Sequence, residues 1–124
     1  MKRSNSVGGS RTYPISPYMQ ECFQRASAIL GQFNEGLYRL NSERQLTPAE
    51  QQLIENLDPR SALARQFAQL RQTSDRLWQR ALNERNAINN QAINDVRMAT
   101  ELGEQMIVCA NHWSTLKSQL MDNA

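Results

Sequence analysis

Apolar residues recur at alternating spacings of four and three along two long stretches of this 124-residue chain. This spacing puts them along one side of an α-helix, and it is typical of helices that pair with one another along a heptad seam. The seam residues are Met19, Phe23, Ala26, Leu30, Phe33, Leu37 and Leu40 in the first stretch, and Leu63, Phe67, Leu70, Ser74, Leu77, Ala81, Glu84 and Ile88 in the second. Two such seams predict helices that pack side by side.

Composition favours helix over sheet, because the chain has only five Gly and four Pro and is otherwise rich in helix-forming residues. We predict an all-α protein with a mobile N-terminal segment, residues 1–16, and a single helical domain, residues 17–124. The N-terminal segment is Ser-rich and basic and has too little apolar surface to offset the entropy of ordering. Gly31 and Gly36 lie beside the first seam, where they weaken an isolated helix, and we interpret them as points of close approach to a neighbouring helix.

Three helix starts share one pattern, a capping side chain directly before a Pro whose fixed φ suits the first helical position. The middle start is the strongest, because Thr47 and Glu50 also form the pattern of a capping box. The three starts are Ser16-Pro17, Thr47-Pro48 and Asp58-Pro59. They predict helices over about 17–42, 48–57 and 59–121.

The Asn-rich stretch 83–95 decides whether the last predicted helix is continuous. If the seam is shifted by one step of four after Ile88, it stays mainly apolar to the end of the chain, which is a stutter within one helix of about 60 residues and 90 Å. Because Asn is a poor helix former that tolerates turn geometry, a turn at Asn89-Asn90 is the alternative, and it gives a compact three-helix bundle. The stutter favours the continuous helix, so we expect a helical hairpin of coiled-coil type with a long C-terminal helix.

No group of residues indicates a reaction. Cys109 and His112 face the same way on a helix, but zinc needs three or four protein ligands and His112 is the only His in the chain. Cys22 and Cys109 are expected to be reduced thiols. There is no phosphate-binding Gly loop and no catalytic triad pattern. We therefore predict no catalytic residue, no metal, no cofactor and no enzyme activity.

Charged residues alternate in sign along the chain in blocks, and the block 59–88 is rich in Arg. Arg71, Arg80 and Arg85 flank the second seam, where a paired helix usually supplies acids, but the first seam has none at its flanks. These Arg are either solvated, or matched by acids of another chain, or contacts for nucleic acid. Trp78 lies at the seam's edge with Arg neighbours, as interface hot spots do.

A helix as long as 59–121 exceeds its partner in the chain and leaves apolar residues in need of cover, so we predict a protein partner or a homo-oligomer. The predicted partner-binding residues are Arg71, Trp78, Arg80, Arg85, Val96, Met106 and Trp113. Nucleic acid, held by the basic N-terminus and the Arg-rich block, is the alternative partner.

The predicted function is that of a non-enzymatic helical interaction module, acting as an adaptor, chaperone or assembly subunit. No apolar run is long enough to span a bilayer and the N-terminus lacks the apolar core of a signal peptide, so we expect a cytoplasmic protein or export by a signal-peptide-independent route. A mobile, basic, Ser-rich N-terminus before a helical hairpin is similar in organisation to small secreted or chaperoned components of bacterial type III export systems. The similarity implies a secretion-type partner; no motif carries it.

Overall fold

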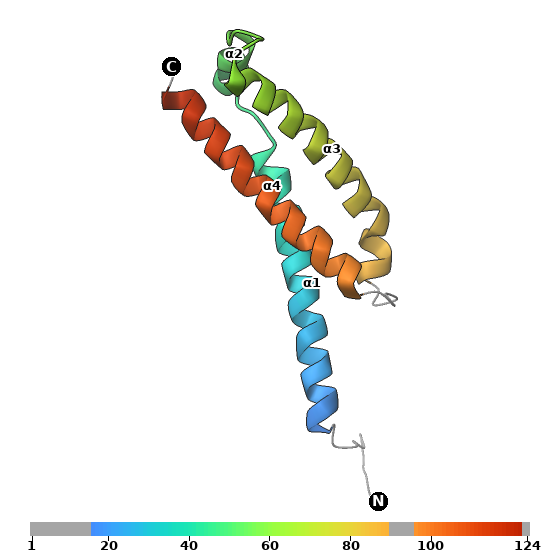
Figure 1. The fold of residues 1–124 in the computed structure, drawn as a ribbon. Coiled ribbons are helices and arrows are strands. Elements are labelled where there is room, and N and C mark those ends of the chain that lie inside the picture. The colour runs from blue at the N-terminus through green and yellow to red at the C-terminus, as the bar shows by residue number, and fades with distance from the viewer. Residues whose placement is uncertain (1–15, 90–95, 123–124) are drawn as a thin grey trace, which may run out of the picture.

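The computed structural model describes residues 16–89 and 96–122, apart from the side chains of Phe23 and Asn89. It contains four helices, α1 (Pro17–Glu43), α2 (Pro48–Glu55), α3 (Ala62–Asn89) and α4 (Val96–Asp122), and the described residues contain no strand (Figure 1). The predicted all-α class and the long helix at the C-terminal end are therefore confirmed. The predicted mobile segment falls almost entirely outside the described residues.

Two helices begin where their capping residues predict. The Ser16 hydroxyl accepts a hydrogen bond from the backbone N–H of Met19 at 3.2 Å, with Pro17 as the first helical residue. Thr47 and Glu50 form the complete capping box. The third predicted start, at Asp58-Pro59, is wrong by three residues. Asp58 accepts from the backbone N–H of Arg60 in a turn, and α3 begins only at Ala62, where the Ser61 hydroxyl accepts from the backbone N–H of Ala64.

The single helix 59–121 is wrong. α3 and α4 are separate helices that run in opposite directions and pack on each other (Figure 1). Phe67 of α3 and Trp113 of α4 have their ring centroids 6.1 Å apart, whereas a straight helix would hold these residues about 70 Å apart at 1.5 Å per residue. The chain reverses direction after α3 because the apolar seams of α3 and α4 then cover each other, which a straight helix does not allow. Asn90 lies outside the described residues, so the geometry of the predicted turn is not described.

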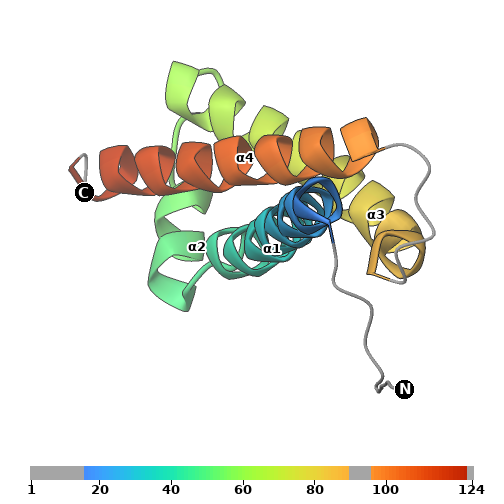
Figure 2. The ribbon, with the colours of Figure 1, turned by 90° about the horizontal axis from the view of Figure 1, so that it is seen from below.

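α4 is the helix on which both α1 and α3 pack, and α1 touches α3 much less (Figure 2). α1 and α4 run in the same direction, because residues that come later in α1 contact residues that come later in α4. The side chains of the core come from all three long helices. They are Phe33, Leu37 and Leu40 of α1, Phe67, Leu70, Leu77, Ala81 and Ile88 of α3, and Ala99, Leu102, Met106, Cys109, Ala110, Trp113, Leu116 and Leu120 of α4.

α1 and α4 approach most closely at a pair of glycines. A Cβ on Gly36 would lie 3.0 Å from the carbonyl oxygen of Gly103, and a Cβ on Gly103 would lie 3.3 Å from the Cα of Phe33. The predicted close approach at Gly36 is confirmed. It is wrong for Gly31, where a Cβ would have nothing within 4 Å.

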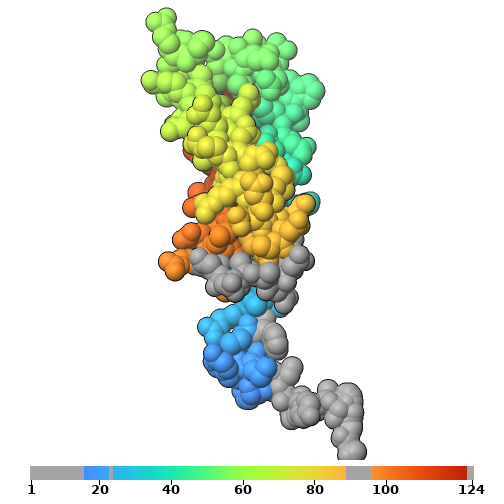
Figure 3. Space-filling model, turned by 90° about the vertical axis from the view of Figure 1, so that its right-hand side faces the viewer, coloured from blue at the N-terminus to red at the C-terminus, as the bar shows by residue number. Residues whose placement is uncertain are grey.

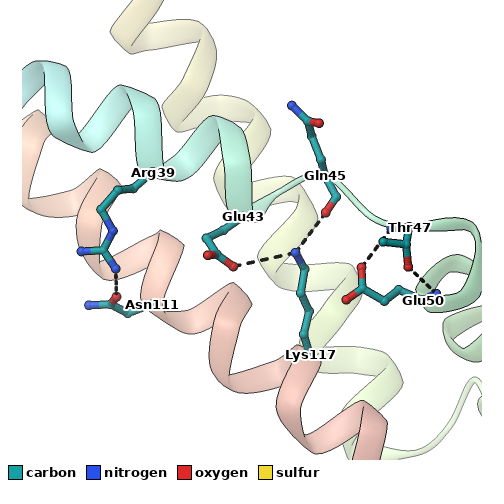
Figure 4. A network of polar contacts seen from close by, with 7 residues as sticks. All are labelled: Arg39, Glu43, Gln45, Thr47, Glu50, Asn111 and Lys117. Atoms are coloured by element: carbon teal, nitrogen blue, oxygen red, sulfur yellow. Dashed lines mark hydrogen bonds and ion pairs between the residues drawn. The ribbon is translucent and has the colours of Figure 1, made fainter.

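Polar contacts join the C-terminal end of α1 and the link that follows it to α4 (Figure 4). The Arg39 guanidinium donates to the Asn111 side-chain oxygen at 2.6 Å. The Lys117 ammonium donates to the carbonyl oxygen of Gln45 at 3.0 Å and lies 3.8 Å from the Glu43 carboxylate. These bonds tie the link between α1 and α2 to α4 and set the register of the two long helices.

Candidate functional site

The seven predicted partner-binding residues lie in different environments, two in the core and five at least partly exposed. Met106 and Trp113 are 0% and 2% exposed, so both lie in the core and not on the surface where a partner would meet them. They are buried because α4 runs back along α3 and packs on it. In a single straight helix, the same residues would need another chain to cover them. The partner-binding role of the other five stays a prediction.

These five residues do not form one patch. Arg71, Arg80 and Arg85 are exposed at separate points of α3, and Val96, at the start of α4, is 48% exposed. Trp78 is half-buried, and its ring lies beneath the Arg44 guanidinium, 5.3 Å from the ring centroid.

Arg44, which the sequence did not single out, joins three helices. It is the C-cap residue of α1. Its guanidinium donates to the Asp75 carboxylate of α3 at 2.7 Å while it stacks on Trp78. Its positive charge also lowers the pKa of the Cys109 thiol of α4, against the larger rise that burial causes. The heptad pattern does not indicate Arg44, because this residue follows the last seam residue of α1. Its contacts with Asp75 and Trp78 form only when α3 packs beside the end of α1.

Next to Arg44 is a cleft of about 290 Å³, which we call the junction cleft because all four helices or their links contribute to it. Its wall contains two predicted residues, Arg71 and Trp113, which are far apart in the sequence. The lining residues are Arg44, Leu46, Gln51, Arg71, Ser74, Asp75 and Trp113.

Two of the residues that line the junction cleft carry a side-chain donor without a hydrogen-bond partner among the described residues. Among the described residues, the Arg71 guanidinium has no ion pair or hydrogen bond. The indole N–H of Trp113 is the only buried side-chain donor in the described part of the chain that has no acceptor. Such a buried donor destabilises a fold by roughly 1–3 kcal/mol.

Cys109 and His112 line a different groove, of about 470 Å³, between α3 and α4. Burial raises the pKa of the Cys109 thiol, and the nearby Arg44 charge lowers it to a smaller extent. The net rise disfavours the thiolate that a nucleophile or metal ligand needs. No group of three His, Cys, Asp or Glu side chains in residues 16–89 and 96–122 is arranged to hold a metal. Cys22 and Cys109 are both free thiols, Cys22 exposed and Cys109 buried.

A second candidate surface is the first part of α1, residues 17–28, which we call the projecting segment. It extends beyond the end of the bundle, as the blue atoms of Figure 3 show. Every described side chain in it is exposed, including Tyr18 at 71% and Met19 at 49%. The seam becomes covered only from Ile29 and Leu30 onwards, which are half-buried against the core.

No helix in the described part of the chain is both long enough and apolar enough to cross a membrane. The chain matches no protein-family model, and it has no significant match among curated proteins or among solved structures.

Proposed function

We propose that this protein is a non-enzymatic helical interaction module that docks a partner helix on its projecting segment. One observation carries the proposal: the heptad seam of α1 continues for about three turns beyond the point where α4 begins. The same apolar pattern that buries Phe33, Leu37 and Leu40 inside the bundle leaves Met19 and Ala26 exposed outside it. Such a pattern is typical of a surface that a second helix covers.

The chemistry of the projecting segment points to an apolar partner surface. Its charged pair, Glu21 and Arg25, lies at heptad positions away from the seam, and the two side chains face each other at 3.8 Å. The residues that flank the seam, Gln20, Cys22 and Ser27, are uncharged. A partner helix therefore needs an apolar stripe and no matching charges.

The small size of the projecting segment favours transient binding of a partner. Twelve helical residues extend about 18 Å, and a two-helix contact of that length falls towards the small end of specific interfaces. Adaptors, chaperones and assembly subunits use contacts of this kind. The similarity of layout to type III export components makes a secretion-associated protein the first partner to test.

We expect Met19→Asp to weaken association by at least about tenfold, because it places a charge in a surface that must become dry. Tyr18→Asp is the matched control, since the neighbouring Tyr18 is more exposed but lies off the seam. Both changes add one acid in the first turn of α1 and should leave the melting temperature nearly unchanged. Sedimentation equilibrium at tens of micromolar measures self-association, and affinity capture from the native host followed by binding measurements with the recovered protein measures a foreign partner.

A compact monomer that recovers no partner would contradict the proposal, and so would equal losses in the two variants. We do not extend the proposal to nucleic acid. The Arg residues of α3 occupy heptad positions on different sides of the helix, with Asp75 and Glu84 between them, and so they give no single basic face.

A further inference from the structure

The junction cleft carries one positive charge that the described residues do not neutralise. Of its two guanidinium groups, that of Arg44 is held by the Asp75 carboxylate at 2.7 Å. The other, on Arg71, has no partner among the described residues. A carboxylate is the group whose two oxygens match the fork of N–H donors that an Arg presents.

Two residues with buried neutral donors, Ser74 and Trp113, line the same cleft as Arg71. Trp113 forms part of the cleft wall and its indole N–H has no acceptor among the described residues. Ser74 is 1% exposed, and its hydroxyl makes only a long bond, 3.3 Å, to the carbonyl oxygen of Arg71. Both of these donors are buried, so the group that the cleft presents to an anion is the exposed Arg71 guanidinium, while the one carboxylate of the wall, Asp75, is already paired.

An apolar cleft of about 290 Å³ between α2 and α3 adjoins the junction cleft at Arg71, which lines both. The two clefts also share an aromatic contact, because Phe67 of the apolar cleft packs on Trp113 of the junction cleft. Its lining residues are Ile54, Glu55, Leu57, Pro59, Ala64, Phe67, Ala68 and Arg71. α2 has no fully buried residue, so its apolar side chains leave the cleft partly open.

We propose that these two clefts together bind an acidic–apolar segment of a partner protein: an Asp or Glu carboxylate on Arg71 in the junction cleft, with a neighbouring apolar side chain in the α2–α3 cleft. Glu55 favours this orientation, since it is one of the residues that line the apolar cleft and its negative charge disfavours a second carboxylate there. The site lies at the opposite end of α1 from the projecting segment and does not rest on docking there.

Arg71 is exposed, so its attraction for a carboxylate is screened by salt. A short peptide is therefore expected to bind in the millimolar range and more weakly as the salt concentration rises. In a full-length partner, this contact would add to others, and its main contribution would be specificity for an acidic residue beside an apolar one.

The test uses the full chain and two peptides, acetyl-Leu-Glu-Leu amide and its uncharged counterpart acetyl-Leu-Gln-Leu amide. The chain has two Trp, so the two indole N–H signals in a ¹H–¹⁵N spectrum are assigned with Trp78→Phe. We expect the Glu peptide to move the Trp113 signal saturably and the Gln peptide to bind about tenfold more weakly or worse, because a charge-assisted hydrogen bond is lost.

Arg71→Gln should weaken binding of the Glu peptide by about tenfold or more. Arg85→Gln is the matched control, because Arg85 is equally an exposed Arg of α3 beside the seam but does not line either cleft. Met19→Asp should leave the titration unchanged, which separates this site from the projecting segment. Absence of a saturable shift, equal binding of the two peptides, or equal losses in the two Arg variants would overturn the assignment.

Discussion

Replacing Gly36 by Leu is expected to lower the free energy of unfolding by about 3 kcal/mol, because it forces a large side chain into a close helix contact. Even a Cβ at this position would lie 3.0 Å from the Gly103 carbonyl oxygen and 3.1 Å from the Cβ of Met106. The carbonyl belongs to a helix backbone and cannot rotate away, so α1 and α4 must separate. The gain in helix propensity from replacing Gly, about 1 kcal/mol, is too small to compensate.

Gly31→Leu is the matched control on the same helix. A Cβ there meets nothing within 4 Å, and the position is exposed. The free energy of unfolding should rise by about 0.5–1 kcal/mol, since only the propensity term changes. Urea denaturation followed by circular dichroism measures both variants. Equal effects of the two substitutions, in either direction, would show that the helices do not cross at Gly36.

Trp113→Ala is expected to lower the free energy of unfolding by about 3–5 kcal/mol, the range for removing a large aromatic side chain from a core. Trp113 is 2% exposed and packs on Phe67 at 6.1 Å between ring centroids. Loss of its unpaired indole N–H returns part of this cost, roughly 1 kcal/mol, so the lower end of the range is the better expectation.

Trp78→Ala provides the comparison, because Trp78 is half-buried and mainly supports the Arg44 guanidinium. Its removal should cost about 1 kcal/mol, from lost area and a cation–π contact. The comparison separates two roles for Trp113. A core residue costs stability in the isolated chain, whereas a partner contact would leave unfolding unchanged and reduce only binding.

The sequence predicts local structure well here because caps and heptads act over a few residues. The start of α1 at Pro17 and the capping box of Thr47 need only side chains three residues apart. The seam of α3 is also correct, including buried Ser74. The predicted start of α3 was wrong because two possible capping residues, Asp58 and Ser61, lie within one turn of each other. In the structure, Ser61 caps the helix.

The path of the chain after α3 could not be predicted in the same way. A stutter and a turn both satisfy the spacing of apolar residues around Ile88, and only the packing of α4 on both α1 and α3 distinguishes them. That packing depends on contacts between distant residues, such as Gly36 with Gly103 and Phe67 with Trp113.

The candidate sites were predictable only in part. The sequence indicated Arg71 and Trp113 separately, but nothing local places them in one cleft with Arg44. It also indicated the seam from Met19 to Leu40 without showing that its first half lies beyond the start of α4. Which part of a seam is covered depends on the register of two helices, and here that register is set by side chains such as Arg39 and Lys117.

The return of α4 along α3 is the central claim, because it buries Met106 and Trp113 and leaves the projecting segment as the uncovered part of the seam. Nitroxide labels on cysteines placed at Arg65 and Ser118, with Cys22 and Cys109 replaced and labelled chains diluted with unlabelled protein, test it by electron spin distance measurement. The folded-back bundle predicts a separation within one chain below about 30 Å, a few helix diameters. A separation near 80 Å, as expected for one helix rising 1.5 Å per residue, would contradict it.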